Sequence, residues 1–162
     1  MNTASRKQIL TFGIYVILLA QLNVDIFTSN FRVSLGILLL PVLVYLYHEI
    51  PVLPIALVSG VGVFVSRVFI QSLRYGFVVG DIPAFFPEFV FYLVYGLLLS
   101  GYFRRKEFKM PHPHCYIPLF VMDYLANLSE LLCRLGVGAF SLPLQINILL
   151  VALLRTVILW AV

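Results

Sequence analysis

The sequence predicts an all-α fold, a polytopic membrane bundle of six transmembrane helices with both termini in the cytoplasm. Of the 162 residues, 62% are hydrophobic and only 11% are charged, and the mean hydropathy is +1.03. Soluble domains carry about 25% charged residues, so this chain has too few charges to cover a water-facing surface. At about 20 residues per spanning helix, the length allows six or seven helices and leaves no room for a soluble catalytic domain.

Apolar stretches separated by polar or proline-containing turns are expected to form a single transmembrane domain. The expected spans cover residues 9–27, 33–47, 51–73, 88–103, 116–135 and 143–162. Pro51 and Pro54 open the third span, because proline is tolerated in the first turn of a helix. Gly60 and Gly62 lie in the same span and are small enough to let a neighbouring helix approach closely.

Basic residues in the short loops set the expected orientation. Arg6 and Lys7 place the N-terminus in the cytoplasm, and the 104–114 loop returns there with four basic residues against one acidic residue. The 74–87 loop then lies outside. A five-helix alternative, which merges the second and third spans, would place the basic 104–114 loop outside and is rejected. The net charge of +4 follows from this asymmetry and does not indicate nucleic-acid binding.

The chain stops while it is still hydrophobic, at residues 159–162 (LWAV). Membrane proteins usually end in a polar tail that anchors the last helix at the interface. We therefore expect the chain to be cut from a longer protein whose next residues are cytoplasmic.

Ionisable residues within the spans are the most informative positions, since each costs about 2.5–3.5 kcal/mol on insertion scales. The fifth span carries four polar residues at spacings of four, three and four, which places them on one helical face. With two residues of the third and fourth spans they form the expected ligand-binding or signalling cavity. Its six residues are Arg67, Glu88, Asp123, Asn127, Glu130 and Arg134.

Buried charges persist only when they are paired. We expect Arg67 to pair with Asp25 or Glu130, near the external side, and Arg155 to pair with Asp123 deeper in the bundle. Asp25 and Arg155 are assigned to structural ion pairs. The polar face of the fifth span either fastens helices together or lines a cavity, and the sequence favours neither. Glu88 is expected above all to cap the fourth span, because an acid in the first turn interacts well with the helix dipole.

Nothing in these residues points to catalysis, to a metal or to a resident cofactor. The nucleotide-binding, zinc-hydrolase and serine-hydrolase motifs are missing from the sequence. His112, His114 and Cys115 are close in sequence but lack a fourth ligand, which disfavours a structural zinc site. Cys115 and Cys133 are expected to be reduced, apolar-behaving thiols.

Several segments resemble the membrane sensor regions of bacterial histidine kinases. They are residues 50–54 (IPVLP), 60–67 (GVGVFVSR), 86–89 (FPEF), 95–97 (YGL) and 123–131 (DYLANLSEL). The resemblance extends from about Thr11 to Val162. It implies a homodimer in the bacterial cytoplasmic membrane, with the phosphoacceptor histidine and the ATP site beyond Val162 and a response regulator as the partner of that downstream module.

A second resemblance is to the substrate-binding subunits of energy-coupling-factor vitamin transporters. It rests on the size, on the six spans and on residues 31–36 (FRVSLG) followed by Pro41. Two departures weaken it: the first span has Ala20 but no alanine-rich small-residue surface for docking a partner, and the chain has no polar C-terminal tail.

The sequence thus predicts the sensory input domain of a two-component kinase. A ligand or membrane state would be detected in a cavity lined by the third, fourth and fifth helices and relayed by the sixth. The alternatives are a transport subunit, which would bind a small molecule tightly, and a purely structural assembly subunit, which would bind none.

Overall fold

The computed structural model describes residues 3–25, 32–47, 50–76, 79–105, 115–136 and 140–161. These ranges contain six α-helices, a short 3-10 helix and two short strands. In chain order they are α1 (Thr3–Ala20), β1 (Asn23–Asp25), β2 (Arg32–Ser34), α2 (Gly36–Leu46), α3 (Val52–Tyr75), η1 (Val79–Phe85), α4 (Phe86–Arg105), α5 (Tyr116–Leu135) and α6 (Leu142–Ala161).

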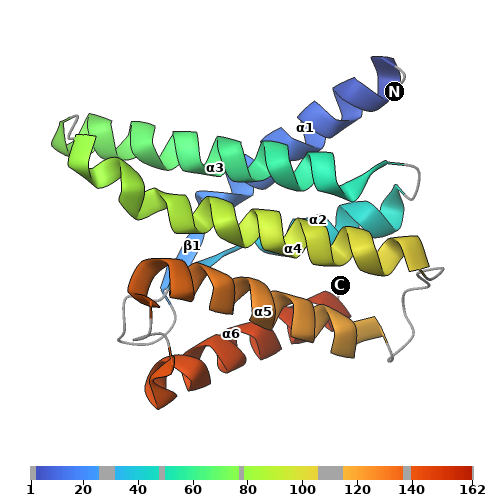
Figure 1. Cartoon of the computed structure of the whole chain (residues 1–162). Coiled ribbons are helices and arrows are strands. Elements are labelled where there is room, and N and C mark those ends of the chain that lie inside the picture. Colours follow the sequence, from blue (N-terminus) through green and yellow to red (C-terminus); the bar gives the residue numbers. More distant parts are fainter. Residues whose placement is uncertain are drawn as a thin grey trace.

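Successive helices run in alternating directions and pack side by side (Figure 1). Helix α3 packs against α1 and α4, α4 also packs against α5, and α5 packs against α6. Helix α2 contacts α1 and, less extensively, α6. The beginning of α1, the end of α4 and the beginning of α5 lie at one end of the bundle (right in Figure 1), and the α3–α4 and α5–α6 connections lie at the other.

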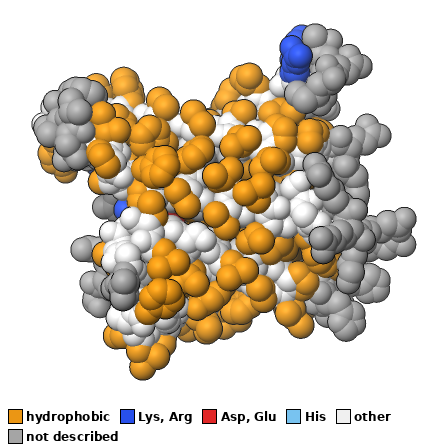
Figure 2. Space-filling model, in the orientation of Figure 1, with side chains coloured by type: hydrophobic (Ala, Val, Ile, Leu, Met, Phe, Trp, Pro, Cys, Tyr) orange, Lys and Arg blue, Asp and Glu red, His pale blue; other side chains and the backbone are white. Residues whose placement is uncertain are grey.

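Among the described residues, three segments are long and apolar enough to cross a membrane: Val52–Tyr75, Ile82–Phe103 and Leu142–Ala161. Their outer faces are apolar as well. On α3 every fourth residue from Leu57 to Leu73 is an exposed large hydrophobic residue, and hydrophobic side chains cover most of the visible face of the molecule (Figure 2). A surface of this kind requires an apolar solvent, so the chain is a membrane protein.

The region between α1 and α2 differs from the expected pair of spans. Helix α1 ends at Ala20 rather than near residue 27. Residues Asn23–Asp25 then pair antiparallel with Arg32–Ser34, with Val24 opposite Val33. The polar residues that follow Ala20 explain the early end, since asparagine and aspartate compete with the helix for backbone hydrogen bonds.

Helix α2 is also shorter than the expected second span. It has 11 residues, which corresponds to a length of about 16 Å, against a hydrocarbon core about 30 Å thick. Helix α5, by contrast, covers residues 116–135, as expected from the sequence.

Small residues set the distance between α3 and α4. A Cβ atom added to Gly96 on α4 would collide with the Cβ of Ala56 on α3, and one added to Gly60 on α3 would lie 3.0 Å from the Cβ of Tyr92 on α4. Gly62 faces Ile17 of α1 in the same way. The close approach expected at Gly60 and Gly62 is therefore confirmed.

Alanine substitutions at two glycines of α4 should have opposite effects. Gly96→Ala overpacks the α3–α4 contact, which typically costs about 1–3 kcal/mol. A Cβ added to Gly101 meets nothing within 4 Å, so Gly101→Ala should be neutral or stabilising by up to about 1 kcal/mol through helix propensity. Thermal unfolding of the detergent-purified variants, followed by size-exclusion chromatography after heating, checks this. Equal melting temperatures for the two variants would contradict the close contact.

Candidate functional site

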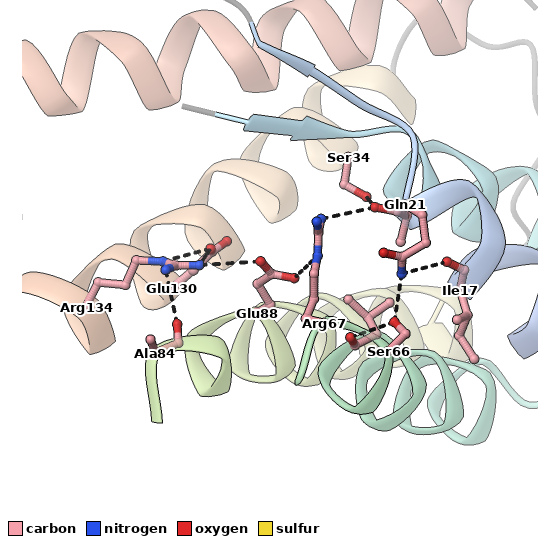
Figure 3. Close-up of polar contacts among 11 residues, drawn as sticks. Ile17, Gln21, Ser34, Ser66, Arg67, Ala84, Glu88, Glu130 and Arg134 are labelled. Atoms are coloured by element: carbon pink, nitrogen blue, oxygen red, sulfur yellow. Dashed lines mark hydrogen bonds and ion pairs between the residues drawn. The ribbon is translucent and has the colours of Figure 1, made fainter. Parts of the chain in front are cut away.

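Four charged side chains from three helices meet near the end of the bundle where α3 joins α4. They are Arg67 of α3, Glu88 of α4, and Glu130 and Arg134 of α5, here called the charge network (Figure 3). Glu88 lies in the first turn of α4 and Arg134 in the last turn of α5. The four side chains fill the junction of the third, fourth and fifth helices, where the sequence predicted a cavity.

The network runs as a row of alternating charges. The Nε atom of Arg67 lies 3.3 Å from Oε2 of Glu88, and Nη2 of Arg134 lies 3.7 Å from the other oxygen, Oε1, of Glu88. Arg134 also donates through Nη2 and Nε to Oε1 of Glu130, at 2.9 and 3.2 Å. Glu88 is therefore the residue that connects α3 with α5.

Both arginines also reach backbone carbonyls at the edges of neighbouring elements. Arg67 donates to the carbonyl of Ala20, the last residue of α1, at 3.2 Å, and Arg134 donates to the carbonyl of Ala84 in η1 at 3.3 Å (Figure 3). Each contact supplies a hydrogen-bond donor to a carbonyl near the end of a helix, where a partner within the helix is missing. The network thus joins five elements: α1, α3, η1, α4 and α5.

A neutral pair reinforces the contact between α1 and α3. The side chain of Gln21, just after α1, donates to Oγ of Ser66 at 2.7 Å and back to the carbonyl of Ile17 at 3.3 Å. Gln21 therefore binds the C-terminal end of α1 to α3, next to Arg67.

A second cluster, the buried triad, lies deeper in the bundle and consists of Asp123, Asn127 and Arg155. Arg155 on α6 donates to Oδ1 of Asp123 on α5 at 2.8 Å, and both side chains are only 4% exposed. Asn127 donates to the same Oδ1 atom at 3.1 Å and accepts a longer bond from Arg155 at 3.5 Å. The guanidinium also lies 5.6 Å from the centre of the Phe91 ring of α4, within range of a cation–π contact.

The triad is incompletely satisfied within the part of the chain that the structure describes. There, Oδ2 of Asp123 and Nε of Arg155 are buried without a hydrogen-bond partner. A narrow crevice between α2, α4, α5 and α6 reaches both residues but has no room for a water molecule. Since unmade hydrogen bonds are costly in an apolar interior, α6 is held by a strong but imperfect contact.

The structure divides the six residues of the expected cavity between two clusters. Arg67, Glu88, Glu130 and Arg134 lie in the charge network, whereas Asp123 and Asn127 lie in the buried triad with Arg155. Arg155 lies beside Asp123, the expected pairing. Arg67 forms an ion pair with Glu88, a partner that was not expected from the sequence, and Glu88 lies in the first turn of α4, where it was expected to cap the helix. The side chain of Asp25 lies outside the described residues.

Some contacts had no clear signal in the sequence. The carbonyls of Ala20 and Ala84 act through the backbone and carry no sequence signature. Tyr124 on α5 donates a hydrogen bond of 2.7 Å to Gln145 on α6. Both residue types are common at membrane interfaces or on polar helix faces, so neither position stood out in the sequence. For metals, no group of three potential ligands occurs among the described residues, and His112 and His114 lie outside them.

Comparison with known proteins gave no match to this chain among protein-family models, curated proteins or solved structures. The function must therefore be argued from the chain's own residues.

Removing one member of the buried ion pair should destabilise the protein more than removing both. Arg155→Met leaves Asp123 buried and unpaired, which typically costs about 3–5 kcal/mol. In the double variant Asp123→Val with Arg155→Met, no buried charge remains, and most of that loss should be recovered. Thermal unfolding in detergent measures this, with Arg74→Met at an exposed position of α3 as the control. A double variant less stable than either single variant would contradict the assignment of this pair.

Proposed function

We propose that this chain is the membrane-embedded sensory domain of a two-component histidine kinase in the bacterial cytoplasmic membrane. In this proposal the six helices form six spans with both termini in the cytoplasm, and α2 crosses together with the adjoining strands. A ligand or a membrane state acts at the charge network, and α6 relays the effect to a cytoplasmic module. The resemblance of residues 123–131 and of the other quoted segments to kinase sensor regions supports the class of protein.

The distribution of basic residues supports the orientation. Arg6 and Lys7 are exposed near the start of α1, and Arg104 and Arg105 form the end of α4. Both places lie at the same end of the bundle (Figure 1). By the positive-inside rule this end faces the cytoplasm, so the charge network faces the outside.

The observation that carries the proposal is that α5 takes part in both charge clusters. Glu130 and Arg134 join it to α3 and α4 through Glu88, and Asp123 joins it to α6 through Arg155. Because Asp123, Glu130 and Arg134 all lie on α5, a shift of this helix at the network displaces Asp123 relative to α6. A helix that has two alternative arrangements can carry energetic coupling of this kind.

The signal requires two packings of similar free energy, and the stimulus must bind one of them better. The incompletely satisfied triad supports this, since a second packing that gives Oδ2 of Asp123 a hydrogen-bond partner would regain a bond that the present packing leaves unmade. In this proposal the phosphoacceptor histidine and the ATP site belong to the downstream module, and a response regulator is the partner of that module. Kinase sensors of this kind would act as homodimers.

The alternative function is the substrate-binding subunit of an energy-coupling-factor transporter. A polar cluster at the outer end of a six-helix bundle fits both proposals. The transport subunit would bind a small molecule tightly in isolation and would copurify with a partner membrane protein, whereas a structural assembly subunit would do neither.

Two variants of the charge network test the sensory role in the full native gene product. Arg67→Gln breaks the ion pair with Glu88 from α3, and Glu130→Gln breaks the ion pair with Arg134 on α5. Because both variants disrupt the same network, both should shift phosphohistidine formation in membrane vesicles in the same direction. We expect a change of about fivefold or more, the lower range of allosteric coupling, at unchanged abundance in the membrane. Arg74→Gln, which removes an exposed charge from the same helix as Arg67, should leave the signal unchanged.

Wild-type levels of phosphohistidine in both network variants would contradict a signalling role for the network. A native gene product that forms no phosphohistidine from ATP would contradict the kinase assignment itself, and the transport subunit would then become the leading proposal.

A further inference from the structure

Among the side chains that the structure describes, the charges of the network balance, and this property restricts what can bind there. Arg67 and Arg134 supply two positive charges, and Glu88 and Glu130 supply two negative ones. We infer that the network is the binding site for a zwitterionic group, one ammonium and one anionic oxygen group a few bonds apart. This inference rests on the proposed function, because it names the ligand class of the same site.

The row of charges has one weak link, between Arg134 and Glu88. The Arg67–Glu88 and Arg134–Glu130 contacts are hydrogen-bonded, at 3.3 and 2.9 Å. The Arg134–Glu88 distance is 3.7 Å, which is too long for a hydrogen bond. The network therefore consists of two hydrogen-bonded pairs, one on each side of a junction that is not hydrogen-bonded.

The exposed fraction of the network side chains decreases from α5 toward α3. The side chain of Arg134 is 37% exposed, those of Glu130 and Glu88 are 24% and 23% exposed, and that of Arg67 is 14% exposed. A ligand that approaches from the open side meets Arg134 first, and Glu130 and Glu88 are about equally exposed behind it. Arg134 and Glu88 are the two residues on either side of the junction.

A zwitterion matches this junction better than a simple ion does. Its anionic group accepts hydrogen bonds from Arg134 while its ammonium donates to Glu88, so one long contact is replaced by two charge-assisted hydrogen bonds. A lone anion or cation would compete with an existing partner and would add a net charge to a partly buried site of low dielectric constant. The balanced network therefore disfavours single ions.

Two sources supply this chemistry at a membrane surface. A free amino acid carries an ammonium and a carboxylate, and the headgroup of phosphatidylethanolamine carries an ammonium and a phosphate. The network lies near the end of the bundle, within reach of either source. The feature shared by the two is the neutral pair of opposite charges.

Binding to the purified chain tests the inference without any kinase readout. Glycine, acetate and methylammonium are the soluble probes, titrated by calorimetry and by thermal shift in detergent. The lipid arm compares melting in nanodiscs of phosphatidylethanolamine with melting in nanodiscs of phosphatidylglycerol. We expect glycine to bind about tenfold more tightly than either single ion, or the phosphatidylethanolamine nanodiscs alone to raise the melting temperature. The first result identifies a free zwitterion and the second a headgroup.

Variants on the two sides of the junction sharpen the test. Glu88→Gln leaves one excess positive charge, so it should weaken glycine binding about tenfold and favour acetate over methylammonium. Arg134→Gln leaves one excess negative charge and should produce the reverse preference, with the same loss for glycine. Arg74→Gln should bind glycine like the wild type.

The wild-type protein alone can overturn the inference, even if a variant fails to fold. Equal affinity for glycine and acetate, or no response to glycine together with equal melting in the two lipids, would show that the network does not select zwitterions. A sensory role for the network would survive that result, because the phosphohistidine assay does not depend on the ligand class. Zwitterion binding without phosphohistidine formation would retain the site and exclude the kinase.

Discussion

The cost of leaving a charge unpaired among apolar side chains determines how this bundle is assembled. Most helix contacts in the molecule are between hydrophobic residues, which in a membrane give little preference for one arrangement over another. The ion pairs are different, since each charged side chain requires a particular partner at a particular depth. Asp123 and Arg155 are each 4% exposed and lie 2.8 Å apart, which fixes α6 against one face of α5.

Helix α5 has a central position for the same reason. Its buried face carries Asp123 and Asn127, and the same face continues into Glu130 and Arg134. The first two residues bind α6 and the last two reach α4 and, through Glu88, α3. The remaining contacts have simpler roles: glycines allow α3 to approach α1 and α4, and Gln21 holds the end of α1 to Ser66. None of these contacts connects two charge clusters as α5 does.

The polar face of α5 could be predicted from the sequence, because residues three or four positions apart lie on the same side of a helix. The bounds of α5 and the partner of Arg155 followed from that pattern. The ion pair between Arg67 and Glu88 did not, because Glu88 and Glu130 are at similar depths and only the packing of three helices decides between them. The end of α1 was missed because apolar residues alternate with polar ones over residues 21–27, whereas the backbone departs from the helix after Ala20. The short ribbon of β1 and β2 depends on pairing between two segments, which periodicity within one segment cannot reveal.

The central claim is that the charge network and α6 are coupled through α5, and one distance tests it most directly. Spin labels at two exposed positions, Val61 on α3 and Leu153 on α6, report the separation of these helices by pulsed electron resonance in nanodiscs, in a background without the native cysteines. The account predicts that Glu88→Gln, at the network, shifts or broadens the α3–α6 distance distribution, while Arg74→Gln leaves it unchanged. An identical distribution in wild type and Glu88→Gln would show that the network and α6 move independently, and it would contradict the coupling.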